Sequence, residues 1–285
     1  MARVKERVVE IAVGGSALHA VYHDGGADSE WGMVFCEPFA EEKKCAHRVL
    51  VETARTLAAA KFGCLRFDYR GCGDSPGRFE DYGPTEWVED ITAAAHYMRQ
   101  QVGVRTVGAL GLRLGATLAL QAAEVDRLFD FALLWEPVVN GQHYLKLNLR
   151  RSLIKAMMTE GDEFASEEVR QQHNEAEVVD FDGYPVTQVT REQIAATDLM
   201  ENRPQFPGPT LILNLSSREQ VANEYRELAE QMPNAEAVGV VQEPFWNRIG
   251  LVSSDAVVEA TALWLAELQA EMAAGPAGSN NDTHK

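Results

Sequence analysis

The sequence predicts an α/β protein with a mainly parallel central sheet, helices on both faces and an antiparallel hairpin at its N-terminal edge. From residue 31 onward, short apolar runs alternate with longer amphipathic runs, an order that is typical of strand–helix units. Before them, two alternating runs flank Gly14-Gly15-Ser16, which favours a hairpin. The chain has 285 residues, of which 46% are hydrophobic, so it is long enough to bury a large core.

The predicted elements follow one another in a regular order. Parallel strands are expected at the runs WGMVFCEP (31–38), CLRFDYRG (64–71), TVGALGL (106–112), FALLWEPV (131–138), TLILNLS (210–216) and AEAVGVVQEP (235–244). Helices are expected at 46–60, 84–102, 115–125, 218–232 and 254–272. Between 140 and 209 the alternation is lost, which indicates a lid-like insert. We therefore expect one domain over 1–272 and a disordered tail over 273–285.

Composition excludes several classes of partner. The net charge of −17 disfavours binding to nucleic acid or to an anionic membrane surface. No apolar run is long enough to cross a membrane, and the first residues do not resemble a signal peptide. The four cysteines form no metal-binding spacing, so we expect reduced thiols, a cytoplasmic protein and neither a metal nor another cofactor.

The pentapeptide Gly111-Leu112-Arg113-Leu114-Gly115 joins a predicted strand to a predicted helix. Its pattern is that of a nucleophile elbow, in which the central residue carries the nucleophile. Here the central residue is Arg113, and an arginine cannot act as nucleophile or general base because it does not lose its proton. Two interpretations are open. Arg113 either binds a carboxylate or phosphate ligand at the start of the helix, or forms an ion pair with the chain's own carboxylates.

Three Glu-Pro pairs indicate which carboxylates those are. Glu37, Glu136 and Glu243 each precede a proline at the end of a predicted parallel strand. Because ligands bind at the carboxyl ends of parallel strands, we expect the three glutamates to lie around Arg113 in one crevice. The aromatic residues Trp135, Phe245 and Trp246 are expected either to line that crevice or to fill the core.

A serine-hydrolase triad is missing from its expected places. The histidine should follow the last strand, where the sequence has Phe245 and Trp246 instead, and the next histidine is His284 in the tail. Glu219 follows the preceding strand, but it has no histidine to orient. Ser75 lies in a glycine-rich turn, where local hydrogen bonds to the backbone are expected.

These features together resemble the α/β-hydrolase fold, and within it the exosortase A system-associated hydrolases of the subgroup labelled hydrolase 2, which are serine aminopeptidase-like. The resemblance is carried by FDYRGCGDSPG, EPFAEEKK, GLRLGA, WEPVVNGQHYL and EPFW, and it extends from about residue 8 to 265. It implies a bacterial protein from exopolysaccharide and protein-sorting gene clusters. It also implies an oxyanion-hole-like pair of N–H donors, from Leu114 and from the loop Phe39-Ala40.

Three functions remain open at this stage. The first is a non-catalytic protein that binds a small anionic or acyl ligand. The second is an active hydrolase or acyltransferase on an ester or thioester, with Arg113 stabilising the oxyanion and Glu37, Glu136 or Glu243 as general base. The third is an accessory subunit that binds a protein partner through the acidic insert at 160–177.

Overall fold

The computed structural model describes residues 4–160, 176–248 and 250–274. Its centre is an eight-stranded sheet in the order β1-β2-β4-β3-β5-β6-β9-β10. The strands are β1 (Glu6–Val13), β2 (Ser16–His23), β3 (Trp31–Cys36), β4 (Phe62–Phe67), β5 (Thr106–Leu112), β6 (Phe131–Trp135), β9 (Thr210–Ser216) and β10 (Ala235–Val241). β1 pairs with β2, and β2 with β4, in antiparallel fashion, whereas all other pairs are parallel. The predicted fold class is confirmed.

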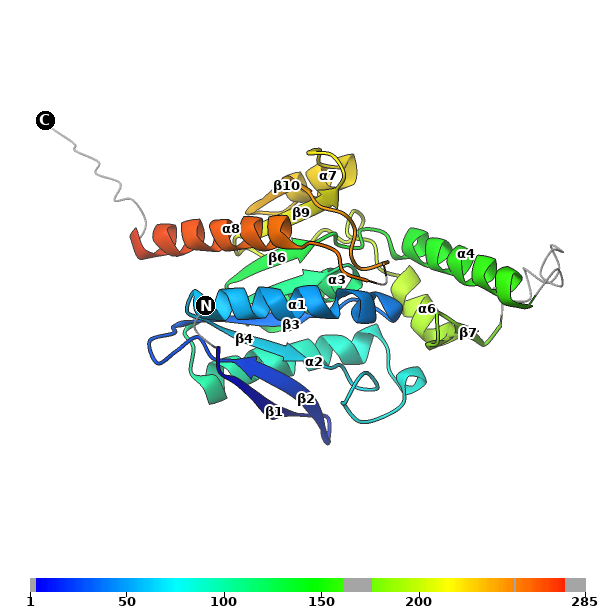
Figure 1. Cartoon of the computed structure of the whole chain (residues 1–285), viewed down its shortest axis with the longest axis horizontal. Helices are drawn as coiled ribbons and strands as arrows, with labels where there is room; N and C mark the ends of the chain where they lie inside the picture. The colour runs from blue at the N-terminus through cyan, green and yellow to red at the C-terminus, as the bar shows by residue number, and fades with distance from the viewer. Residues whose placement is uncertain (1–3, 161–175, 249, 275–285) are drawn as a thin grey trace, which may run out of the picture.

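Helices cover both faces of the sheet (Figure 1). The helices that pack on it are α1 (Glu41–Ala59), α2 (Pro84–Tyr97), α3 (Leu114–Asp126), α7 (Asn223–Gln231) and α8 (Asp255–Ala274). Successive side chains of β3 show the division, because Met33 and Phe35 pack with α1 and α8, whereas Val34 and Cys36 pack with α2 and α3. The strands from β3 to β9 are therefore buried on both sides, which is the reason for their continuous apolar sequence.

The irregular block between β6 and β9 forms a small subassembly at one end of the sheet (Figure 1). It contains α4 (Gly141–Glu160), the hairpin of β7 (Val178–Asp180) and β8 (Pro185–Thr187), and α6 (Gln188–Ala195). Most of the acidic insert predicted as a partner-binding segment lies outside the described residues. No helix among the described residues is long and apolar enough to span a membrane.

One helix begins later than its sequence predicts. The amphipathic pattern favours a start at Arg218, but α7 begins at Asn223. The Ser216 hydroxyl accepts the Arg218 N–H at 3.1 Å, and the Asn214 side-chain oxygen accepts the Ala222 N–H at 2.8 Å. These side-chain acceptors hold the intervening residues in a turn, which competes with the first turn of a helix.

Candidate functional site

The backbone of the elbow is that of a nucleophile-bearing turn. Arg113 lies between β5 and α3 with φ 55° and ψ −125°, a region that non-glycine residues rarely adopt. A Cβ at Gly111 would lie 2.3 Å from Ala116 Cα, and one at Gly115 would lie 2.3 Å from the Cys36 carbonyl oxygen. Only glycine fits at either position, so these two residues allow the turn to pack tightly against α3 and the end of β3.

The Arg113 side chain is surrounded by groups of its own chain. Its Nε lies 3.5 Å from Glu42 Oε1, and its Nη1 lies 3.2 Å from the Glu136 carbonyl oxygen and 3.8 Å from Glu136 Oε2. The rings of Tyr144 and Trp246 each have their centre 5.5 Å from the guanidinium carbon. Burial has the largest single effect and lowers the pKa of Arg113, but the charges of Glu42, Glu136 and the neighbouring tyrosines together outweigh it, so the pKa is raised. Arg113 is therefore a charged, internally paired cation.

Glu42, which the sequence analysis did not single out, is one of the two carboxylates around Arg113. It lies in the first turn of α1, is buried, and accepts a hydrogen bond of 2.9 Å from the Tyr144 hydroxyl. Burial raises its pKa, while Arg113 and Tyr144 oppose that rise. The only sequence signal was its place in EPFAEEKK, next to a predicted strand end.

Glu136 is held by two donors from β9 and one from α7. Its carboxylate accepts hydrogen bonds from Asn214 Nδ2 at 2.7 Å, from the Leu215 N–H at 2.5 Å and from the Tyr225 hydroxyl at 3.1 Å. Burial raises the pKa of this carboxyl group, and the hydrogen bonds from Asn214 and Leu215 oppose the rise. A carboxylate with this many fixed donors is held in place, and it is not free to approach a water molecule.

The other two predicted glutamates have different partners. Glu37 Oε2 lies 2.5 Å from Lys43 Nζ, and the same ammonium group also pairs with Asp68. Glu243 is 60% exposed and pairs at the surface with Arg248 at 2.5 Å. Of the three glutamates, the structure brings only Glu136 into contact with Arg113.

The predicted aromatic residues divide between core and site. Trp135 is fully buried beneath α8, and its Nε1 donates a hydrogen bond of 3.1 Å to Thr261 Oγ1. Phe245 packs against it with ring centres 6.2 Å apart, so both residues take the core role and do not line a crevice. Trp246 is the one that reaches Arg113.

A small cavity lies beside the elbow. Its lining includes Phe39, Ala40 and Leu114, and its space for a water-sized sphere is about 10 Å³, enough for about one water molecule. Within the described part of the chain, the N–H groups of Ala40 and Leu114 donate no hydrogen bond. The Tyr69 hydroxyl, on another wall, is buried and has no hydrogen-bond partner among the described residues either. Three residues of the mostly apolar lining therefore carry donors without a partner among the described residues.

Solved structures of similar architecture match nearly the whole chain. Est1E from Butyrivibrio proteoclasticus with bound ferulic acid has a TM-score of 0.66 and 18% identity, covering 92% of this chain and 99% of its own. The chain has the α/β-hydrolase fold. DcsB in complex with a substrate analogue (TM-score 0.63, 16% identity, 92% and 99% covered) and the Pyrococcus furiosus esterase Pf2001 (0.57, 14%, 83% and 81%) are also similar. No protein-family model and no curated protein matches the chain.

In an α/β-hydrolase fold, the loop after the last strand brings the catalytic histidine to the elbow. Here that loop brings Trp246 to residue 113, and an indole cannot accept the proton of a nucleophile. Ser75 donates to the Asp68 carbonyl at 2.6 Å, a backbone hydrogen bond within its turn as predicted. It also accepts the His19 N–H at 2.9 Å, which links the turn to β2.

One group of side chains has the spacing of a metal site. His19, Asp68 and Asp74 each place a ligand atom within 4.8 Å of the others. Asp68 already pairs with Lys43, and Asp74 is exposed. The Lys43 ammonium group thus already neutralises one of the three possible metal ligands. This cluster of side chains is therefore a poor candidate for a metal centre.

Proposed function

We propose that this chain is a non-hydrolytic protein with the α/β-hydrolase fold that binds a small, uncharged acyl ligand beside its elbow. The supporting observation is that the side chain at the nucleophile position is paired, whereas two backbone N–H groups beside it are not paired with any described residue. Arg113, where the nucleophile is expected, is engaged by Glu42 and Glu136, whereas the N–H groups of Ala40 and Leu114 have no acceptor among the described residues. Two such donors suit the carbonyl oxygen of an acyl group.

The charges around the cavity favour a neutral ligand over an anionic one. Arg113 faces two carboxylates, Glu42 and Glu136, and Lys43 faces two more, Glu37 and Asp68. Each cation is thus already neutralised before a ligand arrives. An anionic ligand would be repelled by these carboxylates, and the described residues beside the cavity leave no unpaired cation to bind it. Of the two ligand classes predicted from the sequence, anionic and acyl, we therefore keep the acyl class.

The walls of the cavity suggest a flat ligand. They include the aromatic side chains of Phe39, Phe79, Trp87 and Tyr184. Phe79 and Tyr184 are only partly buried, and they contact each other with ring centres 5.1 Å apart. Because the cavity has room for only about one water molecule, a ligand must move these two rings outward. The similar Est1E structure holds bound ferulic acid, an aromatic compound with a flat acyl chain.

A hydrolase is the second candidate, favoured by the esterases among the similar structures. It would need a group that activates water beside Arg113. The nearby carboxylates of Glu42 and Glu136 are already hydrogen bonded to Tyr144 and to three donors, respectively. This geometry ranks hydrolysis below binding.

The test compares methyl ferulate with ferulic acid, a neutral and an anionic form of one ligand. Isothermal titration calorimetry is expected to show that the ester binds at least about tenfold more tightly than the acid. Neither the wild type nor Arg113→Ser is expected to hydrolyse methyl ferulate, because Trp246 cannot serve as the base. Binding of the acid alone would contradict the neutral-ligand proposal, and turnover by the wild type that Arg113→Ala abolishes would establish the hydrolase.

The sequence resemblance adds a biological setting to this proposal. On that resemblance we propose that the gene belongs to an exopolysaccharide and protein-sorting cluster of bacteria, where an acyl-binding accessory protein has a use. We further propose a cytoplasmic location, which the four free cysteines of the structure support.

A further inference from the structure

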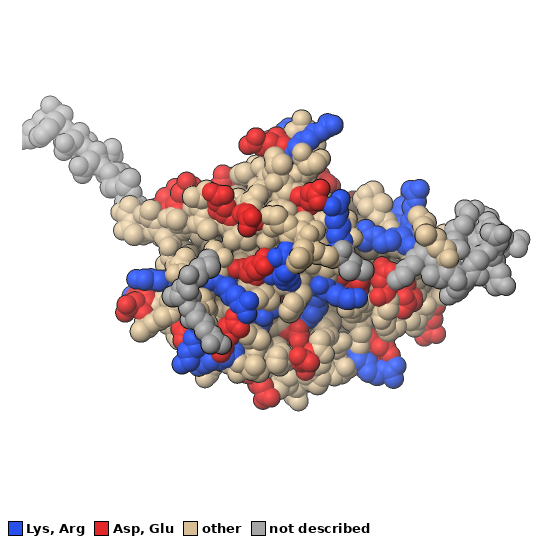
Figure 2. Space-filling view, in the orientation of Figure 1, with Lys and Arg blue, Asp and Glu red and all other residues tan. Residues whose placement is uncertain are grey.

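Two helices at opposite ends of the molecule carry opposite charges. α4 and α8 extend toward the right and left of Figure 1, respectively. α4 contains four basic residues and one acidic residue, and α8 contains four acidic residues and no basic one. In Figure 2, acidic side chains lie along α8 and basic ones lie around the start of α4. This separation is unusual in a chain whose overall charge is strongly negative.

The exposed face of α4 bears a narrow apolar line with cations beside it. Leu147, Ile154 and Met158 are exposed and are spaced by seven and four residues, so they lie above one another along the helix. Met158 is 83% exposed, which is a large exposure for an apolar side chain. Lys146 and Arg150 are exposed beside this line and form no ion pair with any described residue. We call these five residues the α4 stripe.

The exposed face of α8 has the complementary arrangement. Leu263, which is 59% exposed, lies on one line with Ala270, seven residues further on. Glu259 and Glu267, four residues on either side of Leu263, are exposed and have no ion-pair partner within residues 4–160, 176–248 and 250–274. These four residues form the α8 stripe. Each stripe thus has a thin apolar centre and a charged rim of one sign, the pattern by which paired helices select a partner.

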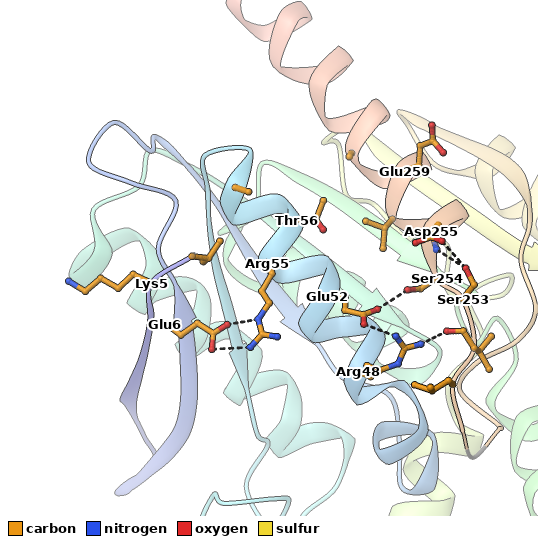
Figure 3. A pocket seen from close by; sticks show the side chains of 16 residues that line it. Lys5, Glu6, Arg48, Glu52, Arg55, Thr56, Ser253, Ser254, Asp255 and Glu259 are labelled. Atoms are coloured by element: carbon orange, nitrogen blue, oxygen red, sulfur yellow. Dashed lines mark hydrogen bonds and ion pairs between the residues drawn. The ribbon is translucent and has the colours of Figure 1, made fainter. Parts of the chain in front are cut away.

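The surroundings of the α8 stripe provide room for a second helix. A broad groove runs between α1 and α8, and Glu259 lies on its α8 wall (Figure 3). The basic residues of the α1 wall are already paired, Arg48 with Glu52 and Arg55 with Glu6. Leu251 lies at the same groove and is 87% exposed. The groove therefore adds an uncovered apolar side chain and leaves its α8 wall acidic.

We propose that the α4 stripe of one copy of this chain packs against the α8 stripe of a second copy. The apolar lines would be removed from water and the two charged rims would face opposite charges. Since every copy carries both stripes, two copies related by a two-fold axis make the contact twice. A membrane surface fits less well, because an interfacial helix needs a broad apolar face and this one has a single line of residues.

The test is sedimentation velocity on the full chain. The wild type is expected to self-associate at low salt and to dissociate at least about tenfold more readily at high salt, where charge attraction is screened. Lys146→Glu/Arg150→Glu and Glu259→Lys/Glu267→Lys are each expected to be monomeric alone. Mixing the two variants should restore association, because each reversed stripe then meets a reversed partner.

Matched controls reverse as many charges elsewhere on the surface. Arg203→Glu/Arg218→Glu and Glu224→Lys/Glu230→Lys change exposed residues outside both stripes and should associate like the wild type. A wild type that stays monomeric at low salt overturns the proposal, as does a mixture of folded variants that fails to associate. Binding of the α4 stripe to phosphatidylglycerol vesicles by a monomeric wild type would overturn it in favour of a lipid surface.

Discussion

Two arginines lie close to strand ends, Arg70 buried and Arg113 partly buried, and the chain holds them in different ways. Arg70, three residues beyond the end of β4, donates from Nε to Asp90 Oδ1 at 2.6 Å and from Nη2 to Glu89 at 2.8 Å and to the Glu86 carbonyl at 2.7 Å. Its own N–H also donates to Asp90 at 2.8 Å. Arg113, at the end of β5, has longer polar contacts of 3.2 to 3.8 Å. Its guanidinium lies over two aromatic rings, whereas that of Arg70 lies over one, Tyr82.

The two arginines are stabilised by different kinds of interaction. Short, directed hydrogen bonds make Arg70 a link between the glycine-rich turn and α2, and its contribution depends on their geometry. Arg113 is stabilised by the field of two carboxylates and by ring faces, which tolerate small displacements. Arg113 thus depends more on neutralising charges than on exact hydrogen-bond geometry.

The largest effect is expected at the Arg70 link. Asp90→Ala leaves a buried guanidinium without its main acceptor, so the free energy of unfolding should fall by about 3–5 kcal/mol. Urea denaturation followed by far-UV circular dichroism measures this change. Glu89→Ala, which removes a 59% exposed partner of the same arginine, is the control and should cost far less. Equal losses in the two variants would contradict the assigned role of Asp90.

A third arginine, Arg66, is paired with a neutral side chain, His23, instead of a carboxylate. Its Nε donates to His23 Nε2 at 3.1 Å, and burial together with the charge of Arg66 lowers the pKa of His23 to about 4. Because the unfolded value is about 6.5, the stability from neutral His23 is present above pH 6.5 and is lost as the pH falls through 4. The loss should reach about 3 kcal/mol and should be absent in His23→Gln. If the stability of the wild type and that of His23→Gln depended on pH in the same way, the role of neutral His23 would be contradicted.

Removing Arg113 should lower the free energy of unfolding by less than removing the main acceptor of Arg70. Arg113→Met leaves Glu42 and Glu136 without their cation, for an expected loss of about 2 kcal/mol in the free energy of unfolding at neutral pH. Burial already raises the pKa of both carboxyl groups, and losing the cation raises them further. A group with a raised pKa gains native stability on acidification, so the gap between variant and wild type should shrink at mildly acidic pH. If the difference in stability between wild type and Arg113→Met grew at acidic pH, Arg113 would not be neutralising Glu42 and Glu136.

The smallest expected effect has the opposite sign. Tyr69→Phe removes a buried hydroxyl that has no partner among the described residues, so thermal unfolding without ligand should shift upward, by about 1 kcal/mol in stability. The same variant should bind methyl ferulate more weakly if the hydroxyl faces the ligand. Tyr22→Phe, at a buried tyrosine that does not line the cavity, is the control for binding. A destabilised Tyr69→Phe would show that the hydroxyl has a partner.

Local sequence patterns predicted the fold and the elbow well. Alternating apolar and amphipathic runs are set by burial on both faces of the sheet, and Gly111 and Gly115 are required by contacts within a few residues. The Glu-Pro pairs predicted strand ends, but not where the carboxylates point. Glu136 turns toward Arg113 with φ 50°, whereas Glu243 turns to the surface.

The partners that complete the site come from distant segments. Glu42 and Tyr144 are 102 residues apart, and Tyr225 lies 89 residues beyond Glu136. Glu42, Tyr144 and Tyr225 each belong to a helix whose rotation about its axis decides which side chain reaches the site. Periodicity predicts that such a helix has a buried face, but not which buried residue meets a charge at the sheet edge.

The strained turn at residue 113 has a practical consequence. Three non-glycine residues around the site, Ala40, Arg113 and Glu136, have φ between 50° and 55°, a conformation that costs of order 1 kcal/mol each and that the surrounding packing maintains. An engineer who wants a new acyl-transfer catalyst would usually have to build that turn. Here that turn already exists at residue 113, so the double change Arg113→Ser and Trp246→His would start from a main chain that already has the conformation of a nucleophile elbow.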